Sequence, residues 1–71
     1  MGNRLNYRQI KSIIEGLLFV SGDEGLDAKQ IAEVVGLETK VVVELLRDMA
    51  EEFRREGRGI QIVELAGAYQ L

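Results

Sequence analysis

The chain has 71 residues, the length of one small globular domain with a small core. Hydrophobic residues make up 46% and charged residues 30%, a balance that excludes a disordered, highly charged chain. The absence of cysteine and histidine excludes disulfides, thiol chemistry, ordinary zinc sites and histidine general bases, and the net charge of −3 disfavours tight binding to nucleic acid.

The first predicted element is an amphipathic helix from about Tyr7 to Val20. Its apolar residues recur at spacings of three and four, the pattern of a helix with one buried face; they are Ile10, Ile13, Ile14, Leu17 and Leu18. Residues 1–6 are expected to form a flexible amino-terminal segment. The polar and glycine-containing run at residues 21–25 predicts a loop after the helix.

Two further helices are predicted, joined by a tight turn. Asp27 with Gln30 forms a capping-box pattern before a short apolar helix, and Gly36 follows that helix where a left-handed residue can close it. The third and longest helix is expected from Glu38 or Thr39 to about Glu56. Its apolar positions again have helical spacing; they are Val42, Leu45, Leu46, Met49 and Phe53.

The pattern changes to that of strands after Gly59. The run 60–65 is rich in β-branched residues, Ala66 to Ala68 supply a turn, and Tyr69 to Leu71 start a second strand. The sequence therefore predicts a mainly α fold with a small β-hairpin, a winged helix-turn-helix in which three helices precede a two-stranded wing. We expect residues 1–71 to form this one domain.

The helix-turn-helix spacing leaves two functions open, a DNA-binding transcription regulator and a protein-interaction domain. A DNA reader needs Arg, Lys, Asn, Gln or Ser early on its second helix. Here that helix, from Glu38 to Glu56, contains six acidic and four basic residues and is net negative. We therefore expect it to be repelled by phosphate and favour contact with protein.

Apolar residues outside the core stripes are the candidate contact residues. Three successive valines cannot all face inward on a helix, so either Val41 or Val43 is expected to be exposed, unless a loop covers it. In the wing, Ile60 and Ile62 are expected to point to one face while Val63 and Leu65 point to the other, so a single core face cannot bury all four. The second face needs cover from a missing carboxyl-terminal segment, a second copy or a partner peptide. The candidate interface residues are Tyr7, Phe19, Val20, Val41, Val43, Val63, Leu65 and Tyr69.

No residues in the sequence form a recognisable catalytic, cofactor or metal site. The segment Gly57 to Gly59 lacks the rest of a phosphate-binding motif, and the carboxylates offer no catalytic pair. Two small basic groups are interpreted mainly as solvated surface; they are Arg4, Arg8 and Lys11, and Arg54, Arg55 and Arg58. The longest apolar run, Leu17 to Val20, is too short for a membrane span, and no signal peptide is recognisable, which favours a cytoplasmic protein.

Two segments of the chain resemble a known family. Residues 9–36, QIKSIIEGLLFVSGDEGLDAKQIAEVVG, are similar to the opening of segregation and condensation protein B, and residues 57–71, GRGIQIVELAGAYQL, resemble the family's first wing. The resemblance implies a non-catalytic subunit that forms a homodimer and binds the kleisin subunit ScpA. ScpA in turn bridges the heads of an SMC ATPase in chromosome condensation and partition, at the nucleoid in the cytoplasm. The family's second winged-helix domain is expected to be absent from this chain.

Overall fold

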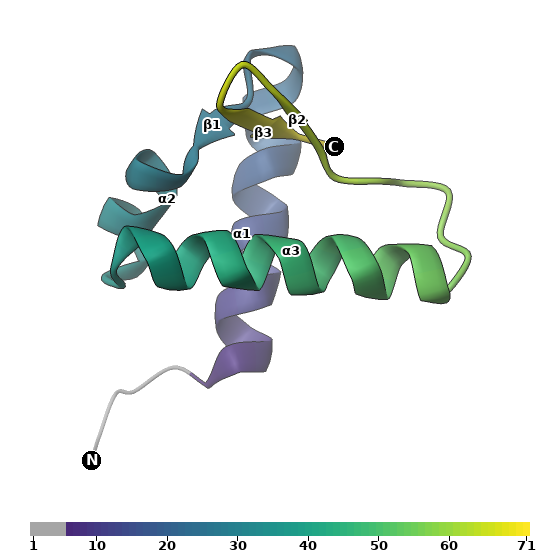
Figure 1. The fold of residues 1–71 in the computed structure, drawn as a ribbon, viewed down its shortest axis with the longest axis horizontal. Coiled ribbons are helices and arrows are strands. Elements are labelled where there is room, and N and C mark those ends of the chain that lie inside the picture. The colour runs from purple at the N-terminus through teal and green to yellow at the C-terminus, as the bar shows by residue number, and fades with distance from the viewer. Residues whose placement is uncertain (1–5) are drawn as a thin grey trace.

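The computed structural model describes residues 6–71, which form three helices and a small antiparallel sheet (Figure 1). The predicted order of three helices followed by a hairpin is confirmed. The flexible segment predicted for residues 1–6 lies outside the described residues, except for Asn6, which caps the first helix. The elements are α1 (Tyr7–Ser21), the 3-10 turn η1 (Gly22–Glu24), β1 (Leu26–Asp27), α2 (Ala28–Val35), α3 (Thr39–Arg55), β2 (Val63–Leu65) and β3 (Ala68–Gln70).

Local side chains and glycines define the helix ends. The predicted capping box is confirmed at α2, where the Gln30 amide donates to Asp27 Oδ1 at 2.8 Å and the Asp27 amide donates to Gln30 Oε1 at 3.0 Å. A second capping box, which sequence reasoning missed, pairs Asn6 with Gln9 at the start of α1. Gly36 follows α2 in the left-handed conformation, with φ of 75°, as predicted.

The end of α3 is a Schellman motif. The Arg58 amide donates to the Phe53 carbonyl at 3.2 Å, and the Gly57 amide donates to the Arg54 carbonyl at 3.2 Å. Gly57 has a φ of 67°, which costs a glycine little. The motif turns the chain away from α3 and starts the segment that leads to the wing.

One small core lies where the three helices meet. Each helix buries one face, and the buried residues are Ile10, Ile14 and Leu18 of α1, Ala28, Ile31 and Ala32 of α2, and Val42, Leu45, Leu46, Met49 and Phe53 of α3. The predicted stripes are confirmed except at the edge of α1, where Ile13 is 37% exposed. Ile13 lies about 100° around the helix axis from Ile14, which places it at the margin of the buried face.

The wing is one part of a sheet with the strand order β1-β3-β2. The hairpin is confirmed, but β2 covers only the last three residues of the predicted strand 60–65. Its turn uses Ala66 and Gly67, both with positive φ, as a two-residue hairpin turn requires. Ile62 packs against the core while Val63 and Leu65 are exposed, so these three residues lie as predicted. Ile60, expected on the same face as Ile62, is instead 41% exposed, because it lies before β2 and does not follow the alternation of a strand. The sequence did not predict β1, because a two-residue strand has no alternating pattern.

Gly25 allows η1 and β3 to approach closely. Leu26 pairs with Tyr69 in the sheet, so the backbone before β1 passes next to β3. A Cβ atom at Gly25 would lie 2.7 Å from the Tyr69 carbonyl oxygen, and Gly25 has a φ of 68°. Both the space and the backbone conformation therefore require glycine here.

We expect Gly25→Ala to destabilise the fold by about 2 kcal/mol or more, because backbone strain of about 1–3 kcal/mol adds to the clash with β3. Gly22→Ala is the matched control, since Gly22 also has a positive φ of 58°, but a Cβ atom there would have no neighbour within 4 Å. Urea unfolding followed by circular dichroism measures both free energies of unfolding. Equal losses in the two variants would contradict a role for the close approach.

Candidate protein-interaction surfaces

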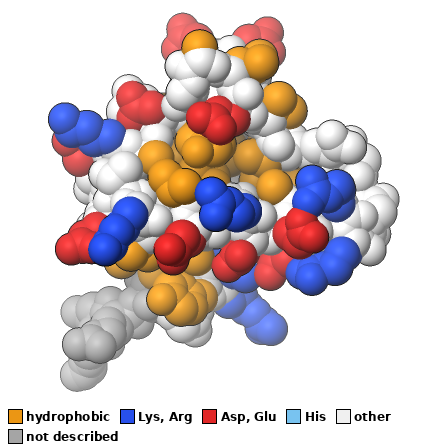
Figure 2. Space-filling view, viewed as in Figure 1, with side chains coloured by type: hydrophobic (Ala, Val, Ile, Leu, Met, Phe, Trp, Pro, Cys, Tyr) orange, Lys and Arg blue, Asp and Glu red, His pale blue; other side chains and the backbone are white. Residues whose placement is uncertain are grey.

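The outward face of α3 carries charges of both signs. Figure 2 shows acidic and basic side chains interspersed along this helix, with an apolar area between them and the wing. The exposed charged residues there include Lys40, Glu44, Arg47, Asp48 and Glu51. Because this helix would have to enter the major groove in a DNA reader, the mixed charge argues against that use of the fold.

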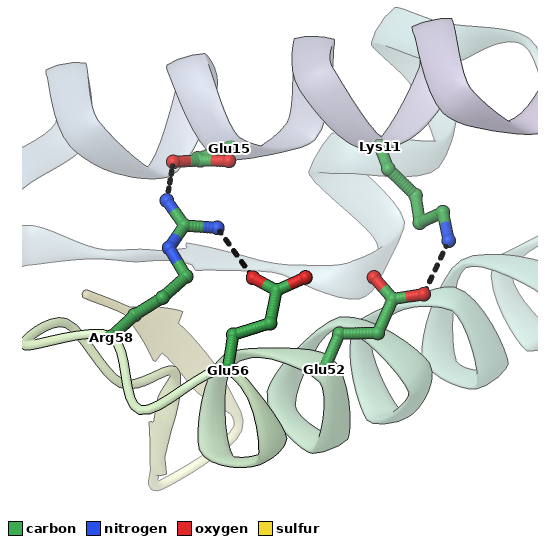
Figure 3. A network of polar contacts seen from close by, with 5 residues as sticks. All are labelled: Lys11, Glu15, Glu52, Glu56 and Arg58. Atoms are coloured by element: carbon green, nitrogen blue, oxygen red, sulfur yellow. Dashed lines mark hydrogen bonds and ion pairs between the residues drawn. The ribbon is translucent and has the colours of Figure 1, made fainter.

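Several bases of the two predicted basic groups are engaged in ion pairs that connect α1 with the end of α3 (Figure 3). Lys11 Nζ lies 2.8 Å from Glu52 Oε2, and an Arg58 guanidinium nitrogen lies 2.8 Å from Glu15 Oε2. The Arg58 guanidinium also lies 3.9 Å from the centre of the Phe53 ring. Arg54 pairs with Glu51, while Arg4 lies outside the described residues. Lys11 and Arg58 therefore contact side chains of neighbouring elements of the same chain, which accounts for their presence without a nucleic-acid partner.

The structure distributes the eight predicted interface residues over several surfaces. Tyr7 and Val41 line a hollow of about 160 Å³ between α1 and α3. Val43 and Tyr69 line a second hollow of about 210 Å³ between α3 and the wing, called here the wing hollow. A third hollow contains Phe19. The other three predicted residues, Val20, Val63 and Leu65, are exposed and line none of these hollows.

The expectation that either Val41 or Val43 is exposed is wrong. Both are half-buried and pack against the core on either side of the buried Val42. Tyr7 and Lys11 of α1 border the hollow at Val41, while Ile62 and Tyr69 border the hollow at Val43. The first helix thus lies beside Val41 and the wing beside Val43. The sequence of α3 alone could not predict these neighbours.

The third hollow, called here the α1 hollow, has a volume of about 310 Å³. It is lined by Ser12, Glu15, Gly16, Phe19, Ile60 and Leu71. Phe19 is 74% exposed, which is unusual for a phenylalanine in a small domain. Ile60 is also exposed and comes from the segment before the wing, so this surface combines α1 with residues far away in the sequence.

Gly16 is the feature of the α1 hollow that sequence reasoning missed. A glycine inside a helix costs about 0.5–1 kcal/mol relative to alanine. A Cβ atom at this position would have no neighbour within 4 Å among residues 6–71, so packing within that part of the chain does not require glycine. The signal was present in the sequence, as a glycine interrupting the apolar pattern of α1.

The wing hollow contains a perturbed tyrosine. Burial raises the pKa of the Tyr69 hydroxyl above its ordinary value, and the neighbouring Glu64 carboxylate raises it further. The Arg47 guanidinium acts in the opposite direction. The hollow therefore combines an apolar floor with a neutral hydroxyl and two opposite charges, a composition suited to an amphipathic protein segment.

Two classes of feature are missing from residues 6–71. None of the helices there has the length and apolar character needed to cross a membrane. Within the same residues, no three carboxylate side chains gather in a way that would hold a metal ion.

Comparison with known proteins identifies the family. A family model described as the segregation and condensation complex subunit ScpB matches residues 12–71. The chain belongs to the ScpB family. It is 57% identical to segregation and condensation protein B of Brevibacillus brevis over 67 residues, 94% of this chain and 34% of that protein. The corresponding Bacillus cereus protein is 52% identical over 60 residues, 84% of this chain and 32% of that protein. The chain thus spans about a third of the length of these relatives.

Solved ScpB structures have the same fold. One is described as a dimer of the ScpB N-terminal domain complexed with ScpA peptide; it has a TM-score of 0.85 and 40% identity, and the match covers 99% of this chain and 77% of that one. ScpB from Mycobacterium tuberculosis also has a TM-score of 0.85, at 24% identity, over 94% of this chain and 41% of that one. The winged-helix fold and the family resemblance predicted from the sequence are both confirmed.

We expect Glu64→Gln to lower the pKa of Tyr69 and Arg47→Gln to raise it, because each change removes one of the two opposing charges. The sequence has two tyrosines, so a Tyr7→Phe background leaves Tyr69 as the single titrating phenol for ultraviolet absorbance. A raised folded-state pKa stabilises the fold below the unfolded tyrosine pKa, and this contribution is lost as the pH rises through the folded value. Shifts of the same sign in the two variants would refute this account of the wing hollow.

Proposed function

We propose that this domain is a non-catalytic adaptor of the bacterial SMC condensin complex that pairs with a second copy of itself and binds the kleisin subunit ScpA. One observation carries the proposal: the solved relative with 40% identity is a dimer complexed with an ScpA peptide and matches 99% of this chain. The proposed role is in chromosome condensation and partition during cell division. The domain contacts the SMC ATPase indirectly, through the kleisin.

The surface supports binding to protein over binding to DNA. Partly apolar hollows lie beside α1 and between α3 and the wing, and protein interfaces concentrate apolar and aromatic side chains in this way. The α3 helix contains four acidic and four basic residues, and Glu38 and Glu56 at its two ends make the segment 38–56 net negative. Among the described residues it has no uniformly basic face. No observation favours the alternative of a transcription regulator.

We place the ScpA segment in the wing hollow. Val43, Ile62 and Tyr69 form its floor, and Arg47 and Glu64 provide opposite charges beside them. An amphipathic segment would bury its apolar residues against this floor while its own charges pair with Arg47 and Glu64. The remaining candidate contact residues, Tyr7, Phe19, Val20, Val41, Val63 and Leu65, stay predictions for the two protein interfaces.

The same proposal covers domain organisation, chemistry and location. Residues 1–71 form one winged-helix domain, which in the full-length family works beside a second one. The proposed domain is a non-catalytic adaptor that binds other proteins and needs no cofactor. Association with the nucleoid in the cytoplasm follows from its place in the complex and needs no strong direct contact between this domain and DNA.

We expect the chain to bind the ScpA segment used in the solved complex, and Arg47→Glu to weaken that binding by on the order of tenfold. Lys40→Glu is the matched control, because it makes the same charge change on the same helix outside the wing hollow. Fluorescence anisotropy with a labelled ScpA segment measures the affinities, and light scattering across a dilution series measures pairing.

A strictly monomeric chain that also ignores the ScpA segment would contradict the adaptor function. Equal losses from Arg47→Glu and Lys40→Glu would contradict the placement in the wing hollow alone. Specific duplex binding at physiological salt that weakens in both variants would instead support the transcription regulator.

A further inference from the structure

We propose that Arg58 is a positioning residue for the wing: it joins the connection between α3 and β2 to α1 and thereby sets the shape of the wing hollow without lining it. The effect on partner binding rests on the proposed function, because the wing hollow is the surface assigned to the ScpA segment. Arg58 follows the end of α3, and the hollow is lined by residues of α3 and of the wing together with Ile62.

The connection between α3 and β2, residues 56–62, contains no helix or strand. Figure 1 shows it leaving the end of α3 and returning to the wing along one edge of the molecule. Its backbone hydrogen bonds to α3 end with the one that the Arg58 amide donates to the Phe53 carbonyl, and within the described part of the chain residues 59–62 form none. The position of this stretch relative to the helices therefore depends on side chains.

The Arg58 guanidinium contacts both α1 and the end of α3 (Figure 3). One of its nitrogens lies 2.8 Å from Glu15 Oε2, the other lies 4.0 Å from Glu56 Oε1, and its central carbon lies 3.9 Å from the centre of the Phe53 ring. The side chains of Arg58 and Glu15 are each 35% exposed, so water and salt screen this pair less than a fully exposed one. No other side chain of residues 57–61 forms a hydrogen bond or an ion pair with the described chain.

The connection leads from Arg58 directly to the wing hollow. Ile62 is its last residue, packs against the core and borders the hollow. The strand β2 begins at the next residue, so a shift of the connection would also move the hairpin. The opposite wall of the hollow belongs to α3, through residues such as Val43 and Arg47. A displaced connection would therefore change the spacing between the two walls.

A second ion pair between the same two helices provides an internal comparison. Lys11 Nζ of α1 lies 2.8 Å from Glu52 Oε2 of α3, and the two side chains are 27% and 37% exposed. Both residues lie within helices, and neither lines the wing hollow. Loss of this pair should therefore weaken the contact between α1 and α3 without releasing the wing.

Hydrogen exchange tests the inference without any partner. We expect Arg58→Gln to raise the exchange rates of the β2 and β3 amides about threefold to tenfold, measured relative to amides of α2 in the same variant. The ratio to α2 removes any overall loss of stability, because global unfolding accelerates both sets of amides. Lys11→Gln is the matched control and should leave this ratio at its wild-type value.

A double-mutant cycle tests whether Arg58 acts through Glu15. Glu15→Gln alone should raise the same ratio, and Glu15→Gln combined with Arg58→Gln should raise it no further than Arg58→Gln alone, because both changes remove one contact. Arg58→Lys retains the positive charge beside Glu15 and should recover part of the protection. Circular dichroism measures the helical content of each variant, and if Arg58→Gln does not fold, Glu15→Gln breaks the same pair and decides the test.

Binding of the ScpA segment used in the solved complex provides a second readout. We expect Arg58→Gln to weaken this binding about threefold to tenfold in fluorescence anisotropy, although Arg58 does not line the hollow, and Lys11→Gln to leave it unchanged.

Three results would each overturn the positioning role of Arg58. They are an unchanged exchange ratio after loss of the pair with Glu15, equal increases in Arg58→Gln and Lys11→Gln, and fully additive effects in the double mutant. Unchanged segment binding by a variant with a released wing would separate the wing position from recognition and refute that part of the inference, while the adaptor function stands. A wild-type chain that does not bind the segment would refute the proposed ScpA binding, and the exchange ratios would still decide the role of Arg58.

Discussion

Burial of one face of each helix in a single small core is the constraint on which the other features of the molecule rest. The fully buried side chains of α1, α2 and α3 converge there, led by Ile14, Leu18, Ile31 and Leu46. A chain of 71 residues has no second core to cover the opposite helix faces. Apolar side chains on those faces, such as Phe19 and Val34, therefore stay exposed within the described residues.

Ion pairs and the small sheet connect the helices outside the core. Lys11 of α1 pairs with Glu52 of α3, and Glu15 of α1 pairs with Arg58, which follows the end of α3 (Figure 3). Both contacts join the two longest helices of the described residues. On the other side, β3 pairs with β1 before α2 and with β2 in the hairpin, so the wing is attached to the start of the helix-turn-helix. The contact depends on a glycine at position 25, because any side chain there would meet the β3 backbone.

The same fold that serves DNA readers here presents surfaces suited to protein partners. The α3 helix lacks the positive field that attracts a duplex, and the wing closes over one edge of that helix to leave a hollow with an apolar floor. The outer face of α1 offers a second, nearly uncharged hollow. The two surfaces differ in polarity and therefore suit protein segments of different composition.

Local spacing and local backbone chemistry were enough to predict the three helices, the capping box at Asp27, the turn at Gly36 and the hairpin, because each of these features is encoded within a few consecutive residues. The sequence also indicated the lack of a DNA-binding charge pattern and the resemblance to ScpB. Which apolar residues remain free, in contrast, follows from tertiary contacts alone. The helical spacing of α3 predicts that Val41 or Val43 is exposed, yet both are half-buried beside α1 and the wing. Ile13 fits the predicted apolar stripe of α1, yet it lies at the margin of the core and is 37% exposed.

The strand β1 exists only because β3 pairs with it, and Gly16 becomes part of a surface only beside Phe19, Ile60 and Leu71. These outcomes depend on segments that meet across the chain, and the periodicity of any one segment carries no information about its neighbours in space.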